Sequence, residues 1–333
     1  MKAIVLEGIN QPLRMREVEL GIIGENEVLV GIKAAALNHR DVWIQKGQYA
    51  NIKFPAVLGS DGAGIVSEVG QQVDKEWLGE QVLINPGHNW GENVKAQSKD
   101  FKILGLPDWG TFAESVRVPV QYILPKPAYL SFEEAAAIPL GGLTAYRALL
   151  TRGQLQKDEK VLITGIGGGV ALLALQFAIT AGAQVWVTSG SDHKIEKAKA
   201  LGAVAGANYK ENGWEEKLHK ETGGFDLIID SAAGEEFNKL INLAITGGRI
   251  VFYGGTQGVI KNISPQKIFW RQLSIMGSTM GSEREFQAMI DFVEKNKIKP
   301  VIDKIFPWQE AEQAMRRMDN SEQFGKIVLQ ANY

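Results

Sequence analysis

A run of glycines is the part of this chain whose residue types and spacing most directly indicate chemistry. Residues 165–171 read Gly-Ile-Gly-Gly-Gly-Val-Ala and join the apolar run 161–164 to a helical pattern. Glycine lets the backbone turn tightly against a pyrophosphate, and free N–H groups in the first helical turn bind its charge. The spacing departs from G-x-G-x-x-G, and the register Gly165-x-x-Gly168-x-x-Ala171 fits better. Between a strand and a helix, such a turn predicts a dinucleotide site; a purely structural turn is the alternative. The predicted contacts are Gly165, Gly167, Gly168, Gly169 and Val170.

The end of the next predicted strand favours NADPH over NADH. Enzymes that use NAD usually carry an acidic residue about 20 residues after the glycine motif, where it binds the ribose 2′-hydroxyl. Here that position is Ser189, so no carboxylate opposes a 2′-phosphate, and Lys194 could neutralise one. Asp192 is the nearest acid, but it is better placed to cap the helix that follows. A solvated Lys194 without a role is the alternative.

The composition argues against a metal centre and against several classes of protein. The chain of 333 residues has no cysteine, which excludes disulfides, thiolate metal sites and a cysteine nucleophile. His88, His193 and His219 are too scattered in sequence to indicate a metal site, so we expect no zinc. The net charge of −2, without a block of like charges, predicts neither nucleic acid nor an anionic membrane as a partner.

The apolar segments of the chain predict no leader and no membrane span. Residues 1–8 read as a strand and lack the basic segment and cleavage site of a signal peptide. The longest apolar stretch, 165–187, is about long enough to cross a bilayer, but its glycines fit a turn, a helix and a strand better. We therefore expect a cytoplasmic protein.

Two different patterns of apolar residues divide the chain into two parts. Residues 1–125 contain short alternating apolar runs cut by glycine and proline, the pattern of a bent or barrel-like antiparallel sheet. From residue 126, strands alternate with helices, which predicts a parallel, doubly wound sheet in a protein of the α/β class. The tail gives a helix over 309–318 and a closing strand over 326–329 that could rejoin the first domain.

Six sequence marks give the chain a resemblance that covers nearly its whole length. They are residues 37–41 (Leu-Asn-His-Arg-Asp), 59–66 (Gly-Ser-Asp-Gly-Ala-Gly-Ile-Val), 135–140 (Ala-Ala-Ala-Ile-Pro-Leu), 143–146 (Leu-Thr-Ala-Tyr), the turn at 165–171, and 325–329 (Gly-Lys-Ile-Val-Leu). With these marks the chain resembles the medium-chain dehydrogenase/reductase superfamily, specifically its zinc-less, quinone-oxidoreductase-like members. The resemblance implies a GroES-like β-rich catalytic domain over 1–125 and 296–333. It implies a Rossmann NADP-binding domain over 126–295, with activity in the cleft between them.

Several residue roles follow from the resemblance. In relatives that use NADPH, lysine and tyrosine at the positions of Lys194 and Tyr209 bind the 2′-phosphate, and both are present here. Relatives are commonly dimers or tetramers, so we expect a homodimer or homotetramer. The residues implied to approach the nicotinamide or the cleft are Thr144, Tyr253, Gly254 and Ser278.

The resemblance also identifies the positions that hold the catalytic metal in zinc relatives, here called the metal station, and most of the ligands are absent from it. Where zinc alcohol dehydrogenases hold their metal, this chain has Asn38, Ser60 and Leu140, with Asp61 as the one plausible ligand. Hydrogen-bond donors must then stabilise the charge on a substrate oxygen, and those near the station are Asn38, Ser60 and Tyr49. We predict that Asn38 orients the oxygen and that Tyr49 donates a hydrogen bond or a proton.

Structural alternatives exist for most of these residues. Tyr49 is also explained as a rim aromatic, Asp41 as a helix cap, and Asp61 as an anchor for backbone N–H groups. His39 is either a base beside Asp41 or, more simply, a satisfied structural histidine. Segment 85–106 has the length of a structural zinc lobe without its cysteines, and we interpret it as a lobe retained without metal.

Taken together, these features predict an NADPH-dependent, metal-independent oxidoreductase. Its substrate would be a small molecule, either a quinone or an α,β-unsaturated carbonyl compound, because conjugation spreads the developing charge. An alcohol dehydrogenase or aldehyde reductase on the same scaffold is the enzymatic alternative. A non-catalytic NADPH-binding sensor is the alternative of another class.

Overall fold

The computed structural model describes residues 1–331, and the chain folds into two compact units. The first unit contains residues 1–141 and the chain from 281 onward, and the second contains 142–280. These boundaries differ from the expected 125 and 295, because the segments between them pack within the first unit. The hydroxyl oxygen of Tyr129, for example, lies within hydrogen-bond distance of both Val293 O, at 3.0 Å, and Ile298 O, at 2.8 Å.

The first unit is built on a seven-stranded sheet, as the alternating pattern of its sequence predicts. Neighbouring strands are antiparallel, apart from the parallel pair β17–β18. In order, the strands are β10 (Ile123–Pro125), β6 (Gln81–Ile84), β5 (Asp61–Val69), β3 (Glu27–Ala36), β18 (Lys326–Gln330) and β17 (Ile302–Pro307), with β9 (Ser115–Pro119) paired to β3. Smaller sheets contain β2 (Arg14–Glu17), β1 (Lys2–Leu6) and β4 (Ala56–Val57), and the pair β7 (Gly87–His88) and β8 (Lys102–Ile103). The helices are α1 (His39–Gln45), α2 (Phe132–Ala136), α9 (Glu283–Lys295) and α10 (Ala311–Asp319), while α3 (Pro139–Tyr146) crosses the boundary.

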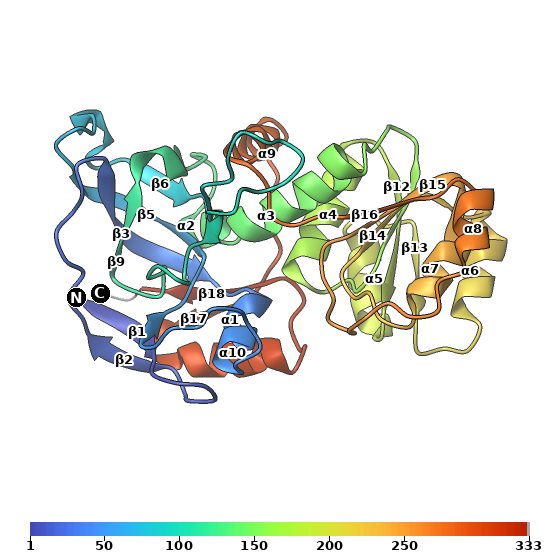
Figure 1. The fold of residues 1–333 in the computed structure, drawn as a ribbon, viewed down its shortest axis with the longest axis horizontal. Helices are drawn as coiled ribbons and strands as arrows, with labels where there is room; N and C mark the ends of the chain where they lie inside the picture. The colour runs from blue at the N-terminus through green and yellow to red at the C-terminus, as the bar shows by residue number, and fades with distance from the viewer. Residues whose placement is uncertain (332–333) are drawn as a thin grey trace. The chain divides into compact units, whose positions relative to one another are not determined.

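The register of the large sheet brings three distant segments to one end of it. Ala36, the last residue of β3, lies opposite Asp61 in β5 and opposite Val328 in β18. Because β5 and β18 both run antiparallel to β3, each begins beside the end of β3. Lys326, the first residue of β18, therefore reaches the chain just beyond β3, at Asn38. Figure 1 shows β17 and β18, from the red end of the chain, within this unit.

The second unit is a six-stranded sheet in which every pair is parallel. Its order is β13-β12-β11-β14-β15-β16, which in chain order reads 3-2-1-4-5-6, the Rossmann arrangement. The prediction of a doubly wound parallel sheet is confirmed (Figure 1). The strands are β11 (Lys160–Ile163), β12 (Gln184–Ser189), β13 (Ala205–Asn208), β14 (Phe225–Asp230), β15 (Ala244–Phe252) and β16 (Ser274–Gly277). The helices are α4 (Gly169–Thr180), α5 (Asp192–Ala200), α6 (Trp214–Thr222), α7 (Phe237–Leu243) and α8 (Pro265–Trp270).

Burial on both faces explains the apolar runs of the central strands. Leu162 and Ile228 are fully buried, and Trp186 packs edge-on against Phe225 with ring centroids 5.6 Å apart. The apolar stretch over 165–187 supplies a turn, α4 and the start of β12. Across residues 1–331, no helix has the length and apolar character needed to cross a membrane.

Candidate active site

Four separate segments contribute to one buried polar cluster at the end of the large sheet. Asp61 is fully buried, and its Oδ2 accepts hydrogen bonds from Lys326 Nζ at 2.8 Å and from Asn38 Nδ2 at 3.0 Å. Its Oδ1 accepts from the backbone N–H of Leu140 at 2.7 Å. Lys326 also donates to Asn38 Oδ1 and Leu37 O, both at 2.8 Å. We call Asn38, Asp61, Leu140 and Lys326 the station cluster, because three of these residues belong to the predicted metal station.

The station cluster fixes the direction in which the Asn38 amide points. An ammonium group only donates hydrogen bonds, so the atom of Asn38 that Lys326 contacts is the amide oxygen. Nδ2 then donates to the carboxylate of Asp61, and its second hydrogen has no partner among residues 1–331. Asn38 is therefore held as a hydrogen-bond donor, which is the capacity that its predicted role requires.

Arg40 is a second buried cation, and it determines what Ser60 and Tyr49 can do. Its Nη1 donates to Ser60 Oγ at 2.7 Å and to Leu104 O at 2.8 Å, and its Nε lies 3.4 Å from Tyr49 Oη. The Ser60 hydroxyl donates to Leu104 O at 2.7 Å, so its hydrogen is already used and Ser60 is not a substrate donor. Tyr49 differs, because its oxygen accepts from Arg40 while its own hydrogen has no acceptor in the described part of the chain.

Asp41 and His39 have structural surroundings. Asp41 Oδ2 accepts from the backbone N–H of Asn38 at 2.8 Å, which caps α1 as the structural alternative predicted. Complete burial raises the pKa of Asp41 to about 6, against the attraction of the nearby Arg40 charge. The ring of His39 packs against Trp43 at a centroid distance of 6.2 Å, and burial lowers the pKa of His39. The two residues therefore do not form an acid–base pair.

Segment 85–106 forms a lobe held by aromatic packing. The ring of His88 stacks on Tyr122 with centroids 3.9 Å apart, and Trp90 is 1% exposed. Burial lowers the pKa of His88 to about 4, which keeps its ring neutral near pH 7. The backbone carbonyls that accept from Arg40 belong to this lobe, so the lobe is tied directly to α1.

The glycine-rich turn in the second unit has the backbone that a phosphate site needs. Gly165 has a φ of +65° and Gly167 a φ of +128°, and both values favour glycine. A Cβ on Gly165 would also lie 2.9 Å from Ser231 Oγ. Helix α4 begins at Gly169 with Gly168 as its N-cap and no side-chain cap, so its first N–H groups face outward to an anion. A Cβ on Gly168 would meet nothing within 4 Å, so the space beside the turn is open.

The carboxyl ends of β12 and β13 bring the predicted 2′-phosphate residues into one neighbourhood. The backbone N–H of Tyr209 donates to Ser189 O at 3.1 Å. A Cβ on Gly190 would lie 2.8 Å from both Tyr209 Oη and Lys210 Cε, so these two side chains fold over the turn. Lys194 lies in the first turn of α5, which begins at Asp192, two residues after Gly190.

The predicted helix cap at the start of α5 is wrong by one residue. Ser191 is the N-cap, and Asp192 is the first helical residue. The carboxylate of Asp192 instead accepts from Asn208 Nδ2 at 2.8 Å, so it has a partner on the neighbouring strand.

The second unit contains a groove of about 510 Å³. Its lining includes three of the residues predicted near the nicotinamide or the cleft, Tyr253, Gly254 and Ser278. Ser278 Oγ is buried and has no hydrogen-bond partner among residues 1–331. Burial raises the pKa of Tyr253, so its hydroxyl stays protonated. Thr144 is not part of this lining, and its Oγ1 lies 3.9 Å from Met280 Sδ.

Comparison with known proteins identifies the family. The chain matches the family model of the alcohol dehydrogenase GroES-like domain over residues 24–128 and that of zinc-binding dehydrogenases over residues 169–295. It is 33% identical to the zinc-type alcohol dehydrogenase-like protein YogA of Leptosphaeria maculans, over 96% of this chain and 94% of that protein. The chain belongs to the medium-chain dehydrogenase/reductase superfamily. A solved structure described as an NAD-dependent alcohol dehydrogenase is 38% identical, with a TM-score of 0.94 and complete coverage of both chains. An acryloyl-coenzyme A reductase of Sulfurisphaera tokodaii is 28% identical over 99% of each chain.

Membership of the superfamily makes this protein an oxidoreductase that uses a nicotinamide cofactor, and it confirms the GroES-like and Rossmann architecture. The second unit fits such a cofactor. Its positive-φ glycines, the uncapped start of α4 and the unpaired hydroxyl of Ser278 are polar features that a bound dinucleotide would satisfy.

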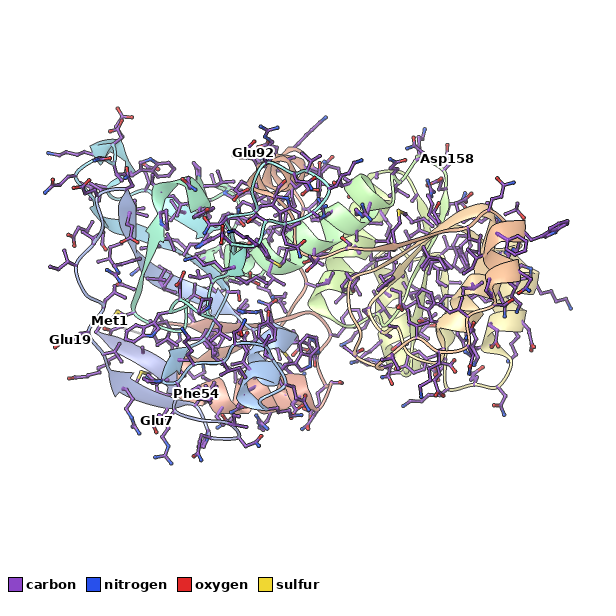
Figure 2. The ribbon with its side chains drawn as sticks, in the orientation of Figure 1. Met1, Glu7, Glu19, Phe54, Glu92 and Asp158 are labelled. Carbon is purple, nitrogen blue, oxygen red and sulfur yellow. The ribbon has the colours of Figure 1, made fainter. Side chains whose placement is uncertain are left out.

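Zinc fits this member of the superfamily poorly. Only Asp61 in the station cluster has the chemistry of a zinc ligand, and its carboxylate is already bound by the ammonium of Lys326. In the described part of the chain, no three or more His, Asp or Glu side chains form a group that could hold a metal ion. Glu92 of the lobe is exposed to solvent (Figure 2).

Sequence reasoning missed Arg40, Lys210 and Lys326 as residues of these sites. Lys326 lies 265 residues from Asp61, and only the register of β18 on β3 brings the two together. One signal was present, because a lysine at the start of a buried apolar strand needs a partner for its charge.

Proposed function

We propose that this protein is an NADPH-dependent reductase that transfers a hydride to a quinone or an α,β-unsaturated carbonyl compound without a metal. The observation that carries the proposal is the ammonium of Lys326, which is bound between Asn38 and Asp61, two residues of the predicted metal station. With Asp61 neutralised by Lys326, the station cluster offers a substrate oxygen a donor N–H in place of a Lewis acid.

Two donors of the first unit match the charge that such a reduction creates. Reduced nicotinamide supplies the hydride, and its two electrons leave negative charge on the substrate oxygen until a proton arrives. Asn38 Nδ2 and Tyr49 Oη each carry a hydrogen without a partner among residues 1–331. A conjugated substrate suits two such donors, because it spreads the charge and needs less electrophilic help than a simple ketone. The name of the acryloyl-coenzyme A reductase relative describes reduction of a conjugated acyl group.

The preference for NADPH is supported by the charges around the end of β12. Ser189 offers a hydroxyl where NAD enzymes usually offer a carboxylate. Lys194 lies in the first turn of α5, and Lys210 folds over Gly190. The nearest acid, Asp192, is engaged by an asparagine of β13.

Cofactor titration of the protein, stripped of metal, tests this preference. We expect NADPH to bind more tightly than NADH, and Lys194→Ala to weaken NADPH about 10-fold, or ~1.4 kcal/mol, because one charged contact to phosphate is lost. NADH should change less than about 2-fold, since it has no 2′-phosphate. Equal binding of both cofactors by the unmodified protein would contradict the proposal.

An alcohol dehydrogenase is the second candidate, because the solved relative at 38% identity is described as an NAD-dependent alcohol dehydrogenase. The two are separated by turnover with 1,4-naphthoquinone and trans-2-hexenal against oxidation of alcohols, each with and without a chelator. Alcohol oxidation with NAD that a chelator abolishes supports the second candidate. Tight NADPH binding without turnover of any substrate supports a sensor instead.

The predicted homodimer or homotetramer and the predicted cytoplasmic location belong to the same proposal. Sedimentation velocity of the purified chain measures the first directly.

A further inference from the structure

We propose that Lys326 is a positioning residue whose ammonium holds the amide of Asn38 with its nitrogen, rather than its oxygen, presented to the substrate. The inference rests on the proposed function, because Asn38 is the donor in that reaction. It assigns a role to a buried cation that neither the sequence marks nor the chemistry of the cofactor explains.

The contacts of Lys326 show that it acts through another residue. Its three N–H donors are used by Leu37 O, Asn38 Oδ1 and Asp61 Oδ2, each at 2.8 Å. Its side chain is 4% exposed, so a substrate oxygen has no donor of Lys326 to reach. Lys326 therefore does not replace a metal by direct contact with the substrate.

An asparagine amide by itself has no preferred end. Its oxygen and nitrogen are nearly identical in size, so only the surrounding hydrogen bonds decide which end faces which way. Here the oxygen faces the cation of Lys326 and the nitrogen faces the carboxylate of Asp61. A reversed amide would place N–H groups against an ammonium and an oxygen against a carboxylate, so both contacts would become repulsive. The charged partner on the oxygen also strengthens the amide as a donor.

The rest of the cluster keeps this arrangement rigid. Asp61 balances the charge of Lys326, and its other oxygen is fixed by the backbone N–H of Leu140 at 2.7 Å. Asn38 is also the N-cap of α1, so its backbone is fixed by the helix. A donor held on both sides in this way is pre-organised for a developing oxyanion.

The test removes the cation without leaving a buried charge. Lys326→Met alone would strand the carboxylate of Asp61, so the informative variant is Lys326→Met with Asp61→Asn. We expect this neutral double variant to fold and to bind NADPH within about 2-fold of the unmodified protein, because both residues lie outside the Rossmann unit. Its kcat with 1,4-naphthoquinone should fall about 10- to 100-fold, less than the loss expected for removing an oxyanion donor outright.

Two comparisons separate positioning from a structural role. In an Asn38→Ala background the same double substitution should cost less than about 3-fold further, since there is no amide left to hold. The matched control is Arg317→Met with Asp303→Asn, which removes an ion pair of 2.6 Å in the same unit and should leave kcat within about 2-fold. Unmodified kcat in the double variant, or an equal loss with and without Asn38, would overturn the proposal.

A measurement without turnover keeps the inference distinct from the proposed function. In protein labelled with ¹⁵N-asparagine, the side-chain amide of Asn38 is assigned by its loss in Asn38→Asp. The neutral double variant should shift this signal and the control pair should not; an unshifted signal refutes the positioning role. If the unmodified protein reduces neither 1,4-naphthoquinone nor trans-2-hexenal, the proposed function fails, and the amide signal still decides the role of Lys326.

Discussion

The station cluster of the first unit and the Ser278 site of the second unit differ in how their buried polar groups are satisfied. In the first unit, all three N–H groups of Lys326 donate to protein acceptors, and both oxygens of Asp61 accept hydrogen bonds. In the second unit, the hydroxyl of Ser278 is buried without a partner among residues 1–331, and α4 begins without a side-chain cap. Buried polar groups that lack partners cost stability unless a ligand satisfies them. The site around Ser278 and the start of α4 is thus suited to receive a ligand, whereas the station cluster is organised around its own internal cation.

The largest expected effect is that of Lys326→Met, which disrupts the fully paired station cluster. The substitution leaves the carboxylate of Asp61 buried without its cation, and we expect the free energy of unfolding to fall by about 3–5 kcal/mol. The matched control is Arg317→Met, whose partner is Asp303; because the Arg317 side chain is 29% exposed, solvent screening limits its loss to about 1 kcal/mol. Urea unfolding measures both. Equal losses would mean that the station cluster is no more sensitive than an ordinary ion pair.

The next effect depends on pH and concerns Asp41. Burial raises the pKa of Asp41 from 3.8 to about 6, so the folded state holds its proton to a higher pH than the unfolded state does. The free energy of unfolding therefore falls as pH rises from about 4 to 6, by about 3 kcal/mol, and the cost is complete above that range. Asp41→Asn removes this dependence. Parallel stability curves for the two proteins between pH 4 and 7 would show that Asp41 titrates normally.

The contrast between the two sites is sharpened by two glycines of the glycine-rich turn, where the second unit would receive a cofactor. Gly165 has a φ of +65°, and its Cβ would lie 2.9 Å from a side-chain oxygen, so Gly165→Ala should cost about 1–2 kcal/mol of stability. Gly168 has an ordinary φ of −73° and open space around its Cβ, so Gly168→Ala should leave stability nearly unchanged. It should still weaken cofactor binding, because its methyl group enters the space that a pyrophosphate would use. Thermal unfolding and cofactor titration of both variants test this contrast.

Local rules were enough to predict most of the second unit. Strands such as β14 are buried on both faces, so their apolar runs are visible in the sequence, and the glycines of the turn are required by backbone angles. Helix ends were less accurate. The helix expected over 309–318 runs from Ala311 to Asp319, because residues 308–310 form a 3₁₀ turn before it.

The first unit depends on contacts that no local rule reveals. Lys326 meets Asp61 through the register of three strands, and Arg40 meets the lobe through carbonyls more than 60 residues away. The boundaries near 141 and 281 likewise depend on contacts such as that of Tyr129 with the chain after α9. The sequence therefore predicted Asn38 and Tyr49 as donors but could not show which cations orient them.

The smallest predicted effect concerns a residue that sequence reasoning overlooked. Lys210 folds over Gly190 and has no carboxylate partner among residues 1–331, so its charge is free to meet a 2′-phosphate. Because the side chain is exposed, Lys210→Ala should weaken NADPH binding only about 3-fold, or ~0.6 kcal/mol, and leave NADH binding unchanged. Lys217→Ala is the control, since this exposed lysine pairs with Glu211 instead. A loss of affinity for both cofactors would mean that Lys210 contacts another part of the dinucleotide. A loss confined to NADPH would mean that Lys210 adds a positive charge to the 2′-phosphate site.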